Sequence, residues 1–307
     1  MEKPKAILIA GPTASGKSGL ALRLAERLGG VVVNADSIQV YEGLRILSAR
    51  PSDAEMAGIE HRLYGHVPGD TVYSAGGWQR DMAPLLAELA ERGRLPIVCG
   101  GTGLYFKALL GGFDELAEVP QAIRERWRAR MAAEGPAALH AVLGQRDPEA
   151  ATRLRPTDPQ RILRALELGE ATGGPLSALQ RRSAPGLLRP DETWRITLAP
   201  PRPLLRERIA LRFAAMLEEG GIEEARFFRQ RFGAIGVAGG QAIGLAELWQ
   251  VEDGELSLAE AQTLAVTRTR QYAKRQETWF RNQFDAEWRR FESAEAAERA
   301  LSGAALP

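Results

Sequence analysis

The residues whose spacing most clearly indicates chemistry lie near the start of the chain, where residues 11–18 read GPTASGKS. This segment fits G-x-x-x-x-G-K-[S/T], a loop whose backbone N–H groups cradle phosphate oxygens. A predicted strand, Ala6–Ala10, precedes it and a predicted helix, Ser18–Leu28, follows, which is the context that the motif requires. The helix dipole and Lys17 add positive charge, and the Ser18 hydroxyl can hold Mg²⁺. The predicted diphosphate-binding residues are Gly11, Pro12, Thr13, Ala14, Ser15, Gly16, Lys17 and Ser18.

The loop motif does not identify the molecule that carries the phosphates. The positions of acidic residues further along the chain help to distinguish the possible reactions. The third predicted strand, Leu95–Cys99, runs into Gly-Gly-Thr, where an ATPase usually has an acidic residue that holds Mg²⁺. This departure counts against nucleotide hydrolysis. Asp36, after the second predicted strand at Val31–Val33, is then the best-placed carboxylate to act as a base toward an incoming nucleophile. A helix cap or a turn residue stays the alternative for Asp36 on spacing alone.

The elements that must position these residues alternate between strand and helix. This alternation predicts an α/β fold with a P-loop NTPase-like core, in which helices flank a parallel sheet and ligands bind outside the carboxyl ends of the strands. From about Phe113 the chain becomes helical and rich in arginine, without a convincing strand, and residues 194–198 (WRITL) return to the core. We therefore expect the first part of the core at 1–112, an inserted all-helical subdomain at 113–190, and the rest of the core with a basic helical region at 191–307.

Composition limits the class of protein. Of the 307 residues, 45% are apolar and 26% are charged, the proportions of a globular protein with a substantial core. No apolar stretch approaches the ~18 residues that a membrane span needs, and the N-terminus lacks a signal-peptide cleavage site. The single cysteine, Cys99, excludes an internal disulfide. We expect a cytoplasmic monomer that does not contact a membrane.

Charge is balanced over the whole chain and concentrated near its C-terminus. The net charge of +1 excludes a globally basic nucleic-acid binder but not a locally basic one. Residues 268–290 hold seven basic and three acidic side chains, a local excess of +4. A predicted helix at Leu258–Phe284 places Arg270, Lys274 and Arg281 on one face. Because such a face is usually only solvated, RNA binding needs a further argument.

Six separated segments of the chain occur in an order that matches one family. They span about residues 5 to 290 and read GPTASGKS at 11–18, NADSIQVYEGL at 34–44, VCGGTGLYFKALLGG at 98–112, DPQRILRALE at 158–167, RERIALRFAAMLEEGG at 206–221 and TRQYAKRQETWFR at 269–281. The chain resembles the tRNA dimethylallyltransferase (tRNA isopentenyltransferase) family. This resemblance implies transfer of a dimethylallyl group from dimethylallyl diphosphate to N6 of the adenosine immediately 3′ of the anticodon in tRNA. The phosphate loop would then hold the diphosphate leaving group with Mg²⁺, and the partners would be the tRNA anticodon stem-loop and dimethylallyl diphosphate.

The resemblance also implies roles for single residues. Asp36 matches the base toward the adenine amine, while Thr13, Lys17 and Arg212 would stabilise the diphosphate leaving group. Arg208, one helical turn before Arg212, can share its face. The adenosine must leave its stack, and tRNA and the prenyl donor would meet in a channel across the protein. The matching tRNA-contacting residues are Asp36, Ser37, Ile38, Gln39, Thr102, Arg124, Gln160, Arg161, Ile162, Leu163, Arg164, Gln241, Lys274, Arg275, Gln276, Trp279 and Arg281.

Some of these positions have a simpler interpretation or depart from the family pattern. Residues 157–160 also form a capping box with a proline in the first turn, so Gln160 can serve only its helix. The family often has a tyrosine where this chain has Leu245. Its usual lysine after the base-bearing loop is replaced by Arg50, which keeps a charge but changes the contact.

Three other functions are compatible with parts of the sequence. A P-loop small-molecule kinase explains the loop and Asp36, but not the basic C-terminal helix or the arginine-rich insertion. A prenyltransferase of free adenine nucleotides needs no grip on an anticodon arm, so the basic helix argues against it. A noncatalytic RNA-binding scaffold with a vestigial loop is the third. Cys99 is expected to be inert core, and the three histidines have no metal-ligand spacing.

Overall fold

The protein divides into two compact units. The computed structural model describes residues 4–111, 119–175, 177, 185–233 and 238–303. The core unit consists of residues Met1–Leu110 and Leu187–Pro307, and the helical unit consists of residues Gly111–Gly186. The insertion predicted at 113–190 therefore begins two residues after this helical unit begins and ends four residues after it ends.

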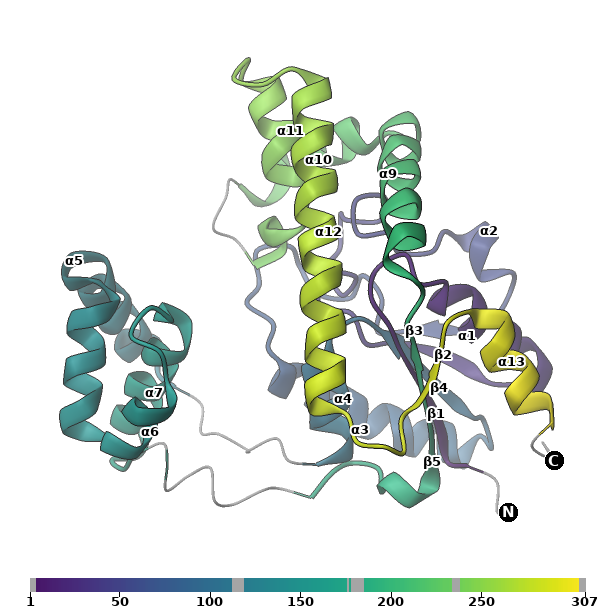
Figure 1. Ribbon diagram of the computed structural model, residues 1–307, viewed down its shortest axis with the longest axis horizontal. Coiled ribbons are helices and arrows are strands. Elements are labelled where there is room, and N and C mark those ends of the chain that lie inside the picture. Colours follow the sequence, from purple (N-terminus) through teal and green to yellow (C-terminus); the bar gives the residue numbers. More distant parts are fainter. Residues whose placement is uncertain (1–3, 112–118, 176, 178–184, 234–237, 304–307) are drawn as a thin grey trace. The chain divides into compact units, whose positions relative to one another are not determined.

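A six-stranded sheet forms the centre of the core unit (Figure 1). Its order is β3-β2-β4-β1-β5-β6, with β1 at Ala6–Ala10, β2 at Val31–Asn34, β3 at His61–Arg62, β4 at Pro96–Gly100, β5 at Thr193–Leu198 and β6 at Arg289–Phe291. Every neighbouring pair is parallel. β1, β2 and β4 are wholly buried, as expected of strands covered on both faces. Because the strands are parallel, the loops that follow β1, β2 and β4 emerge at one edge of the sheet.

Helices cover both faces of this sheet (Figure 1). On one face, α1 (Lys17–Leu28) and α13 (Ala294–Gly303) pack against the strands, and Leu20 and Ala297 share a core with Ile9. On the other face lie α3 (Ala75–Glu91) and α4 (Gly103–Leu110), where the Trp78 and Tyr105 rings stack at 4.7 Å. A short helix, α2 (Asp53–Met56), lies in the connection between β2 and β3.

A second group of helices stands over the carboxyl edge of the sheet (Figure 1). They are α9 (Arg202–Glu218), α10 (Gly221–Phe232), α11 (Leu245–Glu252) and α12 (Leu258–Gln283), with a 3-10 turn at Ala238–Gln241 before α11. Another 3-10 turn, Pro190–Glu192, leads directly into β5. α9 and α12 lie side by side, and Ile209 and Phe213 share a core with Ala265 and Ala273. α12 begins at a capping box in which the Ser257 hydroxyl accepts a hydrogen bond from the Glu260 N–H. Among these helices, α9 and α12 reach the phosphate loop that carries the predicted chemistry.

The helical unit has a core of its own. Its described residues include α5 at Gln121–Arg146, α6 at Pro148–Arg153 and α7 at Pro159–Thr172. Trp127, Leu139 and Ile162 are buried among them. α5 is interrupted at Gly135, whose φ of 78° is a conformation that glycine adopts without strain. Apart from an isolated bridge between Gly111 and Pro185, the described part of this unit contains no strand, as the sequence predicts.

The predicted elements differ from the observed ones mainly at their ends. β1 agrees with the prediction in full, α1 begins one residue earlier, and α12 ends one residue earlier. β3 and β6 are missed because strands of two and three residues are too short to show a pattern. Among the residues that the structure describes, no helix is both long and apolar enough to cross a membrane.

Candidate active site

The phosphate loop links the end of β1 to the first turn of α1. Gly16 precedes the helix with a φ of 87°, and Ala14 has a φ of 63°, so the chain turns sharply. No side chain caps the first turn of α1, which leaves its N–H groups available to an anion. The Lys17 Nζ donates to the Pro12 carbonyl at 3.3 Å. Burial lowers the pKa of Lys17, and the nearby Asp36 carboxylate opposes this shift.

Asp36 lies in the turn that follows β2, and the turn is held from both sides. The Asn34 side chain accepts a hydrogen bond from the Asp36 N–H at 2.8 Å and donates to the Asp36 and Leu63 carbonyls at 3.0 Å. The Asp36 Oδ1 accepts from the Ile38 N–H at 3.0 Å. Both the turn role and the base role foreseen for Asp36 are therefore compatible, because Oδ2 has no hydrogen-bond partner among the described residues.

The loop after β4 lies against the Asp36 turn. The Thr102 N–H donates to the Ala35 carbonyl at 3.1 Å, and the Thr102 hydroxyl accepts from the Ser37 N–H at 2.9 Å. Glycine is required at position 100, since an added Cβ would lie 2.0 Å from the Ala35 carbonyl oxygen. This close approach packs the loop after β4 against the loop after β2 at the carboxyl edge of the sheet.

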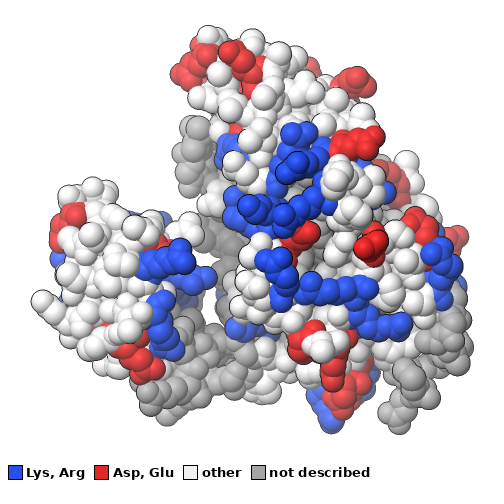
Figure 2. Space-filling model, viewed as in Figure 1, with Lys and Arg blue, Asp and Glu red and all other residues white. Residues whose placement is uncertain are grey.

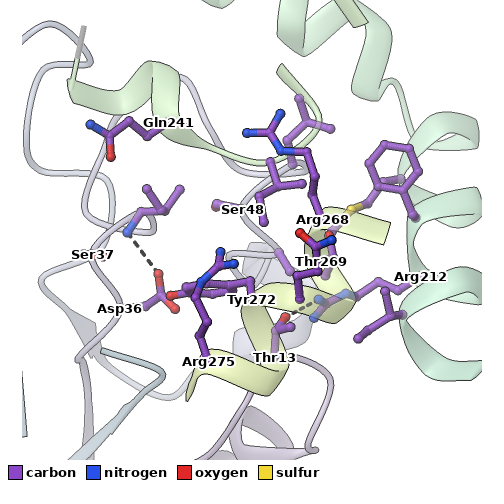
Figure 3. Close-up of a pocket in the computed structure, with 18 residues that line it drawn as sticks. Thr13, Asp36, Ser37, Ser48, Arg212, Gln241, Arg268, Thr269, Tyr272 and Arg275 are labelled. Atoms are coloured by element: carbon purple, nitrogen blue, oxygen red, sulfur yellow. Dashed lines mark hydrogen bonds between the residues drawn. The ribbon is translucent and has the colours of Figure 1, made fainter. Parts of the chain in front are cut away.

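Arg212 approaches the phosphate loop from α9. Its guanidinium donates a hydrogen bond to the Thr13 hydroxyl, so α9 and the loop meet at this pair (Figure 3). Burial lowers the pKa of Arg212 and the Asp36 carboxylate opposes the change, but a guanidinium stays charged in proteins. A half-buried cation therefore lies in the site beside the loop that is predicted to hold a diphosphate.

A cavity of ≈ 410 Å³ contains both Asp36 and the Thr13–Arg212 pair. Figure 3 shows Asp36 on one side of the pair, with Arg268, Tyr272 and Arg275 of α12 around the same space. Its apolar lining comes from Leu47, Ile209, Phe213, Met216 and Ile243. The cavity combines a carboxylate, a cationic end and an apolar wall, which suits an acid–base group transfer on a ligand with charged and apolar parts.

The match to known proteins covers nearly the whole chain. The family model described as IPP transferase matches residues 39–283, and the one described as isopentenyl transferase matches residues 4–66. A tRNA dimethylallyltransferase of Sinorhizobium medicae (strain WSM419) is 51% identical over 291 residues, which are 95% of each chain. The chain belongs to this family. A family member of the same name from Agrobacterium fabrum is 50% identical over 94% of this chain and 96% of that protein.

Solved structures of the family have the same fold. The full-length tRNA isopentenylpyrophosphate transferase from Bacillus halodurans is 35% identical, with a TM-score of 0.69 over 98% of this chain and 96% of that chain. A eukaryotic dimethylallyltransferase acting on tRNA is 26% identical, with a TM-score of 0.82 over 96% of this chain and 77% of that chain. The predicted α/β fold and the predicted prenyltransferase class are confirmed, and the kinase alternative is not favoured.

The predicted RNA-contacting residues of α12 fall on different sides of the helix. Lys274, Arg275 and Arg281 are exposed. Gln276 is buried, and both ends of its amide bond the main chain of other loops, so in this structure its side chain is engaged within the protein and its contact with tRNA stays a prediction. Trp279 packs over Gly103, where an added Cβ would lie 2.1 Å from the indole ring, and only part of the ring is exposed.

The predicted contacts near Asp36 are partly used within the protein. Gln39 Nε2 donates to the Ser48 and Ala49 carbonyls at 3.0 and 2.8 Å, so this amide holds residues 48–49 against the turn. Gln241 is exposed and lines the cavity together with Ser37 and Ile38.

The two positions that depart from the family pattern, Leu245 and Arg50, both make contacts within the core unit. Leu245 is fully buried in an apolar core, and so it makes no surface contact. Arg50 donates to the Tyr41 carbonyl at 3.4 Å, and burial lowers its pKa. Arg208 reaches the phosphate loop weakly, with 3.5 Å from its guanidinium to the Ala14 carbonyl.

The predicted contacts in the helical unit separate by burial. Gln160 and Arg161 are exposed, while Arg124, Leu163 and Arg164 are half-buried. Ile162 is fully buried in the core of the unit, so its side chain serves that core, and its contact with tRNA stays a prediction. The predicted capping box is also wrong, because Asp158 is the cap and its carboxylate accepts from the Arg161 N–H at 3.2 Å.

The structure adds side chains that the sequence patterns did not single out. Glu247 is buried at the start of α11, accepts from the Gly244 N–H at 3.1 Å, and forms an ion pair with Arg268 at the cavity. Glu224 of α10 accepts from three consecutive N–H groups, those of residues 45–47, and so fixes the loop that leads to Ser48. The Glu247 position is signalled only as a carboxylate three residues after a glycine cap, which does not indicate a site.

Proposed function

We propose that the protein transfers a dimethylallyl group from dimethylallyl diphosphate to N6 of the adenosine immediately 3′ of the anticodon in tRNA, and releases diphosphate. The names of the relatives support a dimethylallyl group and a tRNA acceptor. The observation that carries the proposal is one cavity lined by both the Asp36 carboxylate and the half-buried Thr13–Arg212 pair. We further propose that the protein acts as a monomer in the cytoplasm.

Asp36 acts as the base that activates the adenine amine as a nucleophile. The exocyclic amine of adenine is a poor nucleophile, because its lone pair is delocalised into the ring. Asp36 Oδ2, left free by the turn that engages Oδ1, accepts a hydrogen bond from this amine and then its proton. The new bond forms between N6 and C1 of the dimethylallyl group as the bond from C1 to the diphosphate oxygen breaks. The electron pair of that bond leaves with the diphosphate.

The other end of the cavity stabilises the leaving group. Negative charge grows on the diphosphate as its bond to carbon breaks, and preorganised cations and hydrogen-bond donors stabilise such charge strongly in a buried site. Arg212 is already held there by Thr13, and Lys17 lies in the first turn of α1. The apolar wall formed by Ile209, Phe213 and neighbouring side chains suits the hydrocarbon part of the donor.

The residues at the phosphate loop fit a Mg²⁺ ion that arrives with the diphosphate. Ser18 is exposed in the first turn of α1 and offers one hydroxyl ligand. Within the described residues, no group of three or more His, Cys, Asp or Glu side chains could hold a metal by itself. Mg²⁺ commonly takes few protein ligands and completes its shell with phosphate oxygens and water. Bound in this way, it would neutralise part of the diphosphate charge.

The basic side chains around α12 suit an RNA backbone. Figure 2 shows Lys and Arg side chains gathered over the region of α9 and α12. Arg268 and Arg275 line the cavity, whereas Arg270 and Lys274 line a neighbouring groove between α9 and α12. Phosphate contacts of this kind position the RNA, and the target adenosine must be flipped out to reach Asp36. We propose that Arg161 and Arg164 of the helical unit add further phosphate contacts.

One incubation tests the proposed function. Purified protein, Mg²⁺, labelled dimethylallyl diphosphate and unmodified total tRNA are mixed, and the RNA is digested to nucleosides. We expect label in N6-prenyl adenosine. Parallel reactions replace tRNA by AMP, or supply labelled ATP with a mixture of small metabolites as acceptors. Transfer to AMP alone would move the protein to the nucleotide prenyltransferases, and phosphate transfer from ATP alone would favour a kinase.

A further inference from the structure

Gln276 joins α12 to two loops of the active site through a single buried side chain. Its Oε1 accepts a hydrogen bond from the Thr13 N–H at 2.9 Å, and its Nε2 donates to the Gly101 carbonyl at 2.9 Å. Only 5% of the residue is exposed, so neither bond has water as a ready replacement. One carboxamide therefore links the phosphate loop to the loop that follows β4.

The fit around this side chain is close. A Cβ added to Gly101 would lie 2.2 Å from Gln276 Nε2 and 3.3 Å from Asp36 Oδ2. One helical turn further along α12, Trp279 covers Gly103. α12 thus contacts Gly101 and the start of α4 at two successive turns, and a Cβ at either glycine would force the facing α12 side chain to shift.

The same loop carries the connection on to the proposed base. Thr102 follows Gly101 directly, and its hydroxyl accepts from the Ser37 N–H while its N–H donates to the Ala35 carbonyl. Hydrogen bonds therefore connect Thr13 to Gln276 and Gln276 to Gly101, and the adjacent Thr102 is hydrogen-bonded in turn to the Asp36 turn. These contacts connect the end of the cavity that holds the leaving group to the end that holds the nucleophile.

We infer that Gln276 is a positioning residue for the transfer step, one that sets the separation between Thr13 and Asp36. The inference rests on the proposed function. A displacement reaction needs its nucleophile, its carbon and its leaving group in line, and a misplacement of about 1 Å can cost ~10²-fold in rate. Gln276 touches neither reactant in this role, because both of its polar ends bond the main chain.

The test compares two glutamines of α12. Gln276→Met keeps the length of the side chain and removes both hydrogen bonds, whereas Gln283→Met makes the same change at an exposed position near the end of the helix. Single-turnover transfer is measured at saturating tRNA and donor, together with the Kd of each substrate and the Tm. We expect Gln276→Met to lower the transfer rate by about 10²-fold with both Kd values retained, and Gln283→Met to match wild type.

A second variant disturbs the contact between Gln276 and Gly101 by a change at Gly101. Gly101→Ala places a methyl group against Gln276 Nε2, so it should lower the rate in the same way without removing any polar atom. Because the two changes break one connection, the double variant should lose less than the product of the two single losses. This pair keeps the test decisive if Gln276→Met alone folds poorly.

Several results would overturn the inference. A higher Kd for tRNA with a normal rate at saturation would make Gln276 an RNA contact, and a rate loss that only follows the unfolded fraction would make it a structural residue. An unchanged rate in both Gln276→Met and Gly101→Ala would also reject it. If the wild-type protein itself fails to label tRNA, the proposed function fails, and that outcome is distinct from the others.

Discussion

The Arg212 guanidinium donates a hydrogen bond to the Thr13 hydroxyl, although 199 positions separate the two residues in the sequence. The bond brings a cation from α9 to the phosphate loop. Preorganisation of this kind avoids the cost of moving charged groups during the reaction. The pair therefore marks the end of the cavity that we propose binds the diphosphate.

Removing the Arg212 charge should slow the chemical step more than it weakens binding of the acceptor. We expect Arg212→Ala to lower kcat by about 10²- to 10³-fold, the usual effect of losing one stabilising donor. Arg212→Lys should recover part of the rate, since it keeps the charge but loses the forked geometry. The measurement is steady-state transfer to tRNA, with Arg226→Ala on α10 as the control. An equal loss in Arg226→Ala would show that the effect is not local.

Asp36→Asn should remove transfer and leave tRNA binding largely intact. Asparagine keeps an acceptor for the Ile38 N–H, so the turn after β2 should survive the change. It cannot take the proton from the adenine amine. The measurements are single-turnover transfer and the Kd of tRNA by filter binding. A parallel loss of both would make Asp36 a structural residue rather than a base.

Diphosphate binding should weaken as the pH rises, and it should do so at a lower pH than it would if Lys17 had the pKa of an ordinary lysine. Burial lowers the pKa of Lys17 below 10.5, so its ammonium loses its proton earlier as the pH rises. The charged form, which attracts diphosphate, prevails only below that lowered pKa. We expect the affinity for inorganic diphosphate, measured by calorimetry, to fall with rising pH through this value. In Lys17→Arg the fall should move to higher pH, and an unmoved profile would assign the titration to another group.

Lys274→Ala should weaken tRNA binding in a salt-dependent way. Lys274 is exposed on α12 and lines the groove shared with α9. Removal of one phosphate contact should reduce the slope of log K against log salt concentration by about one unit. It should also weaken the binding of all tRNAs to a similar extent. The slope is measured by titration from low to moderate salt. A slope equal to that of wild type would place Lys274 outside the RNA interface.

Ile162→Ala should destabilise the helical unit rather than remove an RNA contact. The side chain is fully buried with Leu139 and Leu166, and such truncations cost about 2–5 kcal/mol. Thermal unfolding should show the loss, whereas Gln160→Ala at an exposed position should not. If Ile162→Ala keeps wild-type stability and loses tRNA affinity, our assignment of Ile162 to the core is wrong.

The sequence predicts best those features that depend on local patterns. The loop from Gly11 to Ser18 identifies its own strand and helix, because the motif, the apolar run and the helix start must occur in that order. The placement of Asp36 after a buried strand also follows from the topology, since parallel strands end at one edge. These local features are enough to predict that the carboxylate and the phosphate loop lie side by side at that edge.

Contacts between distant segments could not be predicted in the same way. The segment KRQETWFR matches a family pattern as a string, but the string does not say which side chains face inward. Gln276 and Arg275 are neighbours in sequence, yet helix geometry turns one toward Gly101 and the other toward the cavity. The same reason explains Ile162, which lies between exposed Arg161 and half-buried Leu163. Helix phase against a packed neighbour decides each case.

The central claim is transfer to one amine of one nucleoside. A synthetic anticodon stem-loop with adenosine immediately 3′ of the anticodon is compared with the same RNA carrying purine riboside, which lacks the N6 amine, at that position. After incubation with dimethylallyl diphosphate and Mg²⁺, the digested RNAs are analysed by mass spectrometry. We predict one dimethylallyl group on that adenosine and none on the purine riboside RNA. Modification of both RNAs, or of another adenosine in the loop, would contradict the account.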